Sequence, residues 1–149
     1  MRYADWDIVF QEVPDEVTLA LNISGCPPRC EGCHSPHLRE EVGEVLTEEV
    51  LDGLLNRYPS VTCVGLMGGD GDLEGVCRMA RHIRERGRKV AWYTGMQALP
   101  QGRDIGLFDY IKVGPYVQAL GGLRSPHTNQ RFYRIADGRM YDETWRFQR

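Results

Sequence analysis

Apolar and polar residues alternate along several short segments of the chain, and this alternation predicts β-strands. Strands are expected at residues 7–13 and 17–23, separated by a turn at Pro14. In the second strand the odd-numbered positions are large and apolar, whereas the even-numbered ones are small or polar and suit the lining of a ligand cavity. Further strands are predicted at residues 61–67, 89–94 and 108–113, and at 131–135 and 139–142 around a hairpin turn at Asp137-Gly138.

Two other segments carry the spacing of amphipathic helices. Thr47 can cap the first helix, which should stop before Pro59, and Gly87 stands where the second helix should end. The residues at helical spacing are Val50, Leu51, Leu54 and Leu55 in the first helix, and Leu73, Val76, Cys77, Ala80 and Ile83 in the second.

The order of strands and helices predicts parallel strands joined by crossover helices. In such a sheet, ligands bind at the carboxyl ends of the strands. Cys33, Gly68 and Gly95 each follow a predicted strand closely, so we expect these three residues to gather at one edge of the sheet.

Composition and charge exclude several classes of protein. A chain of 149 residues forms one domain, residues 1–149, large enough to bury a full core. A formal net charge of −3 and a pI near 5.8 argue against nucleic-acid binding. No apolar run approaches the roughly 20 residues of a membrane helix, and the start lacks a hydrophobic leader. We therefore expect a cytoplasmic protein with no membrane or nucleic-acid partner.

Three cysteines lie together in the predicted loop at residues 24–37. Cys26, Cys30 and Cys33 have the spacing C-x3-C-x2-C. Three thiolates can bind three irons of a [4Fe–4S] cluster and leave the fourth iron open to a small molecule. A zinc site with His34 or His37 as a fourth ligand is the alternative. A disulfide framework is disfavoured, because the chain is long and its five cysteines are an odd number.

Two glycines and an acid follow the predicted strand at 61–67. Gly68 and Gly69 would let the backbone approach a ligand closely, and Asp70 could accept hydrogen bonds from an ammonium group. The alternative is a glycine-rich turn that only leads into the following helix.

Taken together, the cysteine loop and this turn resemble the radical S-adenosylmethionine superfamily. The resemblance implies an α/β fold, an incomplete (partial) βα barrel with a mostly parallel sheet, that holds one [4Fe–4S] cluster and S-adenosyl-L-methionine. It implies Cys26, Cys30 and Cys33 as iron ligands, with Gly68, Gly69 and Asp70 at the methionine end of the cofactor and Gly32 and His34 near its adenine. The chain departs from the common pattern at Gly32, where an aromatic is usual, and at Asp70, where Glu is usual.

Later segments are similar to the activating proteins of anaerobic (class III) ribonucleoside-triphosphate reductase. They lie at residues 30–36, 91–95, 108–116 and 128–131, and the resemblance runs from Asp7 to Ile135. It implies a glycyl-radical activating enzyme that cleaves S-adenosylmethionine reductively. Its implied partners are the glycyl-radical subunit of the reductase and a reductant protein such as flavodoxin or ferredoxin.

Two other functions stay open at this point. One is a radical enzyme of the same superfamily that acts on a small molecule, like a deazapurine-forming synthase, and the other is a zinc-stabilised binding module. Cys63 and Cys77 are expected to be core thiols. Lys112 and Asn129 could contact a ligand or partner or serve only in a surface or turn, and residues 114–131 are a candidate docking or cofactor-facing segment.

Overall fold

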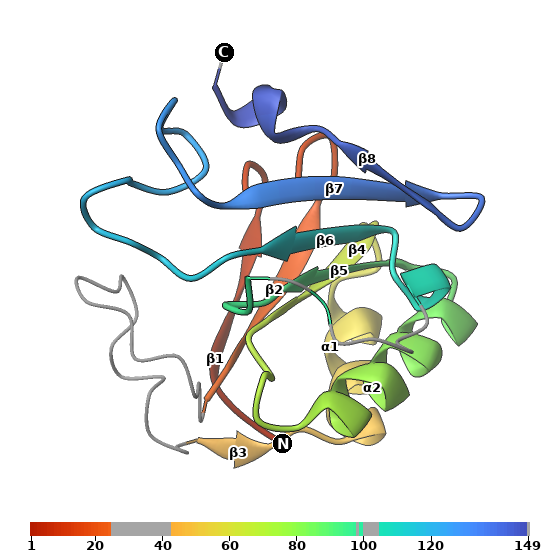
Figure 1. Ribbon diagram of the computed structural model, residues 1–149. Helices are drawn as coiled ribbons and strands as arrows, with labels where there is room; N and C mark the ends of the chain where they lie inside the picture. Colours follow the sequence, from red (N-terminus) through yellow and green to blue (C-terminus); the bar gives the residue numbers. More distant parts are fainter. Residues whose placement is uncertain (25–42, 98, 100–104, 149) are drawn as a thin grey trace.

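A computed structural model describes residues 1–24, 43–97, 99 and 105–148. Its strands form one eight-stranded sheet in the order β3-β1-β2-β4-β5-β6-β7-β8, and both α-helices of the described residues cover the same face (Figure 1). The strands are β1 (Arg2–Val9), β2 (Thr18–Ile23), β3 (Glu44–Val45), β4 (Cys63–Met67), β5 (Lys89–Tyr93), β6 (Tyr110–Val113), β7 (Arg131–Ala136) and β8 (Arg139–Asp142). The helices are α1 (Glu48–Arg57) and α2 (Leu73–Glu85), with the 3₁₀ helices η2 (Ile105–Leu107) and η3 (Thr144–Phe147).

The predicted partial βα barrel with a mostly parallel sheet is wrong. Only the pairings β2–β4, β4–β5 and β5–β6 are parallel, whereas β1–β2, β1–β3, β6–β7 and β7–β8 are antiparallel. Parallel neighbours need a long crossover, usually a helix, and the described residues supply only α1 and α2 for this purpose. After β6 the chain turns back as antiparallel strands. Over the described residues the fold is therefore a mixed, strand-rich sheet with two α-helices.

Both predicted helices are confirmed, together with their ends. The Thr47 hydroxyl accepts a hydrogen bond from the Val50 N–H at 3.1 Å and so caps α1. Asp72 caps α2 by accepting from the Gly75 N–H at 3.0 Å, and Gly87 follows its end with a φ of +73°. No helix among the described residues combines the length and apolar character needed to cross a membrane.

The strand predictions are confirmed except for the first one. The Asp137-Gly138 hairpin forms as expected, because both residues take the left-handed conformation that its tight turn requires, with φ of +53° and +73°. The predicted strand 7–13 is displaced, since β1 spans Arg2–Val9. Asp5 and Asp7 are exposed on β1 and make its beginning polar, whereas the apolar Val13 is fully buried in the turn after the strand.

Hydrophobic residues fill both faces of the sheet. On the helical face, Leu19, Leu21 and Ile23 of β2 are at most 1% exposed and pack with both helices. On the opposite face a smaller core consists of Val13, Cys63, Ala91, Tyr110 and Phe132, with Tyr93, Leu123 and Phe147 packed against it. Thr18 and Ala20, which were expected to line a cavity, are 0% and 5% exposed.

Candidate functional site

The carboxyl ends of β4, β5 and β6 lie side by side at one edge of the sheet, and residues at or just after these ends form the candidate site. We call residues 68–70, 94–96 and 112–114 the carboxyl rim. The predicted meeting of Gly68 with Gly95 is confirmed, since the Gly95 N–H donates to Asp70 in the same turn as Gly68. Such an edge of parallel strands is where α/β sheets bind ligands.

Five predicted site residues lie outside the described residues: Cys26, Cys30, Gly32, Cys33 and His34. Within the described ranges, no three His, Cys, Asp or Glu side chains are grouped so that they could hold a metal ion.

The two remaining cysteines differ in burial. Cys63 is 0% exposed, and burial raises the pKa of its thiol to about 12. A thiol of such high pKa stays protonated, so Cys63 packs as the predicted core residue. Cys77 lies on α2 and is only half-buried.

The two glycines of the rim are required by the fold itself. Gly68 and Gly69 have φ of +113° and +88°. A Cβ added at Gly68 would lie 3.0 Å from the carbonyl oxygen of Ile23, and one at Gly69 would lie 2.5 Å from Cγ2 of Val76. Close packing against β2 and α2 therefore explains both glycines without a ligand.

Backbone groups of Gly68 are already used inside the protein. Its N–H donates to the carbonyl of Tyr93 at 2.9 Å, and its carbonyl accepts from the Trp92 indole N–H at 2.8 Å. The turn is consequently fastened to β5 before any ligand is bound.

Asp70 faces β5 through both of its carboxylate oxygens. The Thr94 hydroxyl donates to Oδ1, and the Gly95 N–H donates to Oδ2 at 2.9 Å. Thr94 is 0% exposed, and its hydroxyl also accepts from the Met96 N–H at 3.1 Å. Sequence reasoning did not select Thr94, because one polar residue after a strand is an ordinary strand terminus.

Lys112 and Asn129 extend the same hydrogen-bonded edge. The Lys112 ammonium donates to the carbonyls of Thr94 and Gly114, at 3.1 and 3.2 Å. The Asn129 amide donates to the carbonyl of Pro115 at 3.0 Å. Both side chains thus have a structural role at the edge, and Asn129 holds part of the segment 114–131 in place.

A row of side chains crosses the sheet beside the rim, on the face opposite the helices. The strand register aligns Asp5, Asn22, Met67, Tyr93 and Lys112 in neighbouring strands. Residues aligned in this way share a face, so an acidic, an amide, a thioether, a phenolic and an ammonium group follow one another. Polar groups of this row already bond within the protein, since the Tyr93 hydroxyl donates to the Glu12 carbonyl and the Asn22 amide to Asp5.

A small cavity lies beside the turn at Gly69. It measures about 180 Å³ and is lined by Met1, Arg2, Ile23, Ser24, Gly69, Gly71 and Asp72. Pockets for drug-sized ligands usually measure roughly 300–1,000 Å³. The cavity is smaller than this range.

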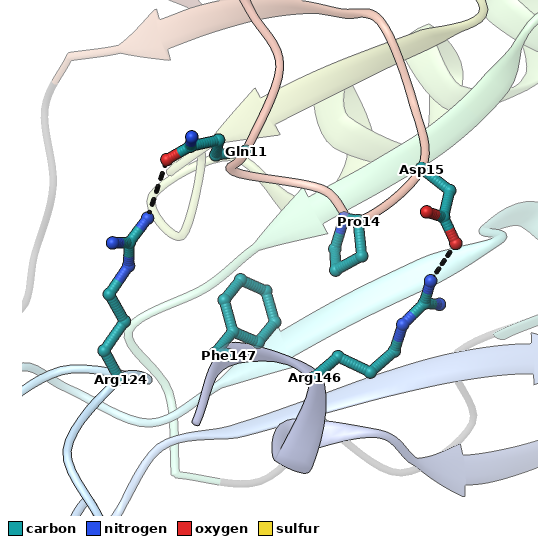
Figure 2. Close-up of a pocket in the computed structure, with 6 residues that line it drawn as sticks. All are labelled: Gln11, Pro14, Asp15, Arg124, Arg146 and Phe147. Atoms are coloured by element: carbon teal, nitrogen blue, oxygen red, sulfur yellow. Dashed lines mark hydrogen bonds and ion pairs between the residues drawn. The ribbon is translucent and has the colours of Figure 1, made fainter. Parts of the chain in front are cut away.

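A second cleft lies between the turn at residues 10–16 and η3, with a volume of about 330 Å³ (Figure 2). Figure 2 shows Pro14 and Phe147 between two arginines. Arg124 donates to the side-chain oxygen of Gln11 at 3.0 Å, and Arg146 is paired with Asp15. These contacts join the turn to the segment 114–131 through Arg124 and to η3 through Arg146, and sequence reasoning did not predict them.

A buried carboxylate lies at the amino ends of the parallel strands. Glu16 is 7% exposed and accepts from Tyr110, Thr62 and Lys89 at 2.7, 2.8 and 3.1 Å. Burial acts to raise its pKa, but the three hydrogen bonds outweigh burial and lower the pKa below the ordinary value of 4.5. We call Glu16, Thr62, Lys89 and Tyr110 the amino-edge cluster.

Comparison with known proteins identifies the family. Residues 16–118 match the model of the 4Fe-4S single cluster domain, which covers more than half of the chain. The chain belongs to this family and carries a 4Fe-4S cluster domain. No curated protein and no solved structure matches it.

Proposed function

We propose that the protein is a radical S-adenosylmethionine enzyme that generates a glycyl radical on anaerobic ribonucleoside-triphosphate reductase. The observation that carries the proposal is the C-x3-C-x2-C segment, which falls inside the region matched by the 4Fe-4S single cluster family. This family is found in radical-S-adenosylmethionine-related proteins. Three cysteines leave one iron of the cluster without a protein ligand, as a cofactor-binding cluster requires.

Each predicted site residue has a place in this proposal. Cys26, Cys30 and Cys33 would hold three irons, the turn 68–70 would receive the methionine end of the cofactor, and Gly32 and His34 would lie near the adenine. When bound, the cluster and cofactor supply the one-electron chemistry that yields a 5′-deoxyadenosyl radical, with the electron from flavodoxin or ferredoxin. The protein's own task is to orient the cofactor and to exclude water.

A protein substrate fits this chemistry. A docked reductase could cover the carboxyl rim and shield the radical from water. A glycine of the reductase would give a hydrogen atom to the radical, so that 5′-deoxyadenosine and a glycyl radical form together. We place this activity in the cytoplasm, where thiols stay reduced.

The test is to mix the reduced protein, S-adenosylmethionine and its cognate anaerobic reductase. We expect a glycyl-radical doublet by electron paramagnetic resonance, with one 5′-deoxyadenosine formed for each radical. Cofactor cleavage without the doublet would refute the activase function and leave only the superfamily.

A radical enzyme for a small molecule is the second candidate. Turnover of a small substrate by the purified protein, without any protein partner, would favour it. The family match argues against the zinc-stabilised module, and iron and sulfide analysis after anaerobic purification decides between cluster and zinc directly.

A further inference from the structure

The position of the turn 68–70 is set by one carboxylate and one buried hydroxyl. We define the Asp70–Thr94 clamp as the Asp70 carboxylate together with the two groups that donate to it, the Thr94 hydroxyl and the Gly95 N–H. We propose that Thr94 is a positioning residue for S-adenosylmethionine, which acts by holding the turn 68–70 through Asp70. The inference rests on the proposed function and gives a role to Thr94, a residue of the segment 91–95 to which the resemblance assigns none.

The orientation of Asp70 is the first argument. Both of its oxygens accept hydrogen bonds from donors that follow β5, so the carboxylate faces the neighbouring strand. Aspartate is one methylene shorter than the glutamate usual at this position, which brings its carboxylate closer to its own backbone. The acid therefore fastens the turn, and the turn's backbone meets the ligand.

The burial of Thr94 is the second argument. Its side chain is 0% exposed, so it can reach a ligand only through the groups that it holds. A buried hydroxyl that both donates and accepts has a fixed orientation, because rotation would break one of its two bonds. Thr94 donates to Asp70 and accepts from the Met96 N–H at 3.1 Å, so its hydroxyl has this fixed orientation.

The clamp also connects the turn to β6. The Met96 carbonyl accepts from the Gly114 N–H at 2.6 Å, and the Thr94 N–H donates to the Lys112 carbonyl at 2.9 Å. A shift of the turn would therefore disturb hydrogen bonds after three parallel strands. This arrangement gives the rim one defined geometry before the cofactor arrives, which lowers the ordering cost of binding.

The sharpest test compares two valine substitutions at buried threonines. Thr94→Val keeps the side-chain shape and removes the clamp hydroxyl. Thr18→Val is the matched control, because Thr18 is also 0% exposed and its hydroxyl has no nitrogen or oxygen partner among the described residues. In anaerobic equilibrium binding to the cluster-loaded protein, Thr94→Val should weaken S-adenosylmethionine about tenfold, the factor that corresponds to about 1.4 kcal/mol. Thr18→Val should bind it normally, and Thr94→Ser should restore most of the affinity.

A double-mutant cycle separates positioning from direct contact. If Asp70 acts through the clamp, Asp70→Ala should weaken binding about as much as Thr94→Val, and the double variant should be no weaker than either alone. Hydrogen exchange should show faster exchange of the backbone amides of residues 69–72 in both single variants, which have unchanged iron content. Loss of binding in Asp70→Ala with normal binding in Thr94→Val would overturn the proposal, because Asp70 would then contact the cofactor itself.

Failure of the proposed function gives a different result. A cluster-loaded wild-type protein that binds no S-adenosylmethionine would overturn the proposed function, and the positioning role with it. Wild-type binding combined with normal binding by Thr94→Val would overturn the clamp proposal alone.

Discussion

The two ends of the parallel strands are built in different ways. At the amino ends, the buried Glu16 is surrounded by side-chain donors from Thr62, Lys89 and Tyr110. At the carboxyl ends, polar side chains are bonded largely to backbone groups, as Lys112 is to the carbonyls of Thr94 and Gly114. Side chains bonded to one another stabilise the fold, whereas side chains bonded to turns set the position of backbone groups that a ligand can meet.

The two edges also differ in how tightly their glycines are packed. Left-handed backbone occurs at both edges, since Gly68, Gly69 and Gly114 have φ between +88° and +113° and Gly87, just before β5, has a φ of +73°. A Cβ added at Gly68, Gly69 or Gly114 would lie 2.5–3.1 Å from a neighbouring atom, whereas nothing lies within 4 Å at Gly87. The turns of the carboxyl rim are therefore held by close packing against their neighbours.

The largest effect is expected for the cysteines of the loop. Cys30→Ala should abolish the cluster, because three thiolates are the minimum for a cubane with one open iron. Iron and sulfide per chain should fall close to zero, and no S-adenosylmethionine should be cleaved. Cys26→Ala and Cys33→Ala should behave in the same way.

Cys63 and Cys77 supply the controls for that experiment. Cys77→Ser changes a half-buried thiol and should leave iron content unchanged. Cys63→Ser places a hydroxyl in an apolar core and should lower the stability while iron is retained. A folded Cys63→Ser protein without iron would show that the predicted ligand set is incorrect.

The next effect concerns the glycine turn. Gly69→Ala should lower the free energy of unfolding by roughly 2–4 kcal/mol, since it adds backbone strain to a clash with the buried Val76. Gly87→Ala is the matched control, because its φ is +73° but no atom lies within 4 Å of the added Cβ. Urea unfolding of the two variants should therefore separate the clash from the strain. Equal losses would mean that packing against α2 does not constrain the turn.

The contact between position 69 and Val76 limits what the Gly69→Val variant can test. From the sequence alone, Gly69→Val is expected to weaken S-adenosylmethionine binding and to spare the cluster, because a side chain would block close approach of the backbone. In the structure the added side chain would meet Val76 of α2, so weak cofactor binding by that variant would not identify the cause. Substitutions at Thr94 avoid this problem because valine has the shape of threonine.

A smaller effect is expected at the amino-edge cluster. Glu16→Gln should lower the free energy of unfolding by about 1.5–3 kcal/mol near neutral pH, the range for a hydrogen-bonded charged group. Glu12→Gln is the control, since Glu12 is exposed on the same turn. An equal loss in both variants would contradict the special role of the buried carboxylate.

The sign of the pH dependence follows from the lowered pKa of Glu16. The carboxylate binds protons less readily in the folded state, so its stabilising contribution is present above the unfolded pKa of 4.5. That contribution is lost as the pH falls through the lower, folded-state pKa. The wild-type protein and Glu16→Gln should therefore approach each other in stability on acidification, which unfolding curves at neutral pH and near pH 3 can measure.

The sequence predicts local structure here better than the arrangement of strands. The helices follow from caps and apolar stripes within ten or so residues, and the hairpin follows from Asp137-Gly138 alone. The direction of β7 depends on how residues 114–130 return the chain to β6, and no local pattern records that. Alternation of strands and helices therefore predicts parallel strands with crossover helices, whereas the described residues form a mixed sheet.

The candidate site shows the same limit. Gly68 and Gly95 could be placed at one edge because each follows a parallel strand. The role of Thr94 depends on the register between β4 and β5, which brings Asp70 within reach of its hydroxyl. Register is a property of the assembled sheet, so this contact has no signature in either segment.

The smallest change in the free energy of unfolding is expected in the cleft of Figure 2. It tests whether exposed contacts stabilise the amino end of the sheet as buried ones do. Arg124 is exposed and bonded to a neutral partner, Gln11, so Arg124→Ala should change the free energy of unfolding by less than about 0.5 kcal/mol. Arg146 is only 17% exposed and is paired with Glu143 at 3.0 Å as well as with Asp15, so Arg146→Ala should cost more. Thermal unfolding of the two variants gives the order directly. A larger loss of stability in Arg124→Ala than in Arg146→Ala would contradict this expectation. Exposed contacts would then contribute as much as the amino-edge cluster to holding the turn at residues 10–16. Stability at this end of the sheet would not depend on burial.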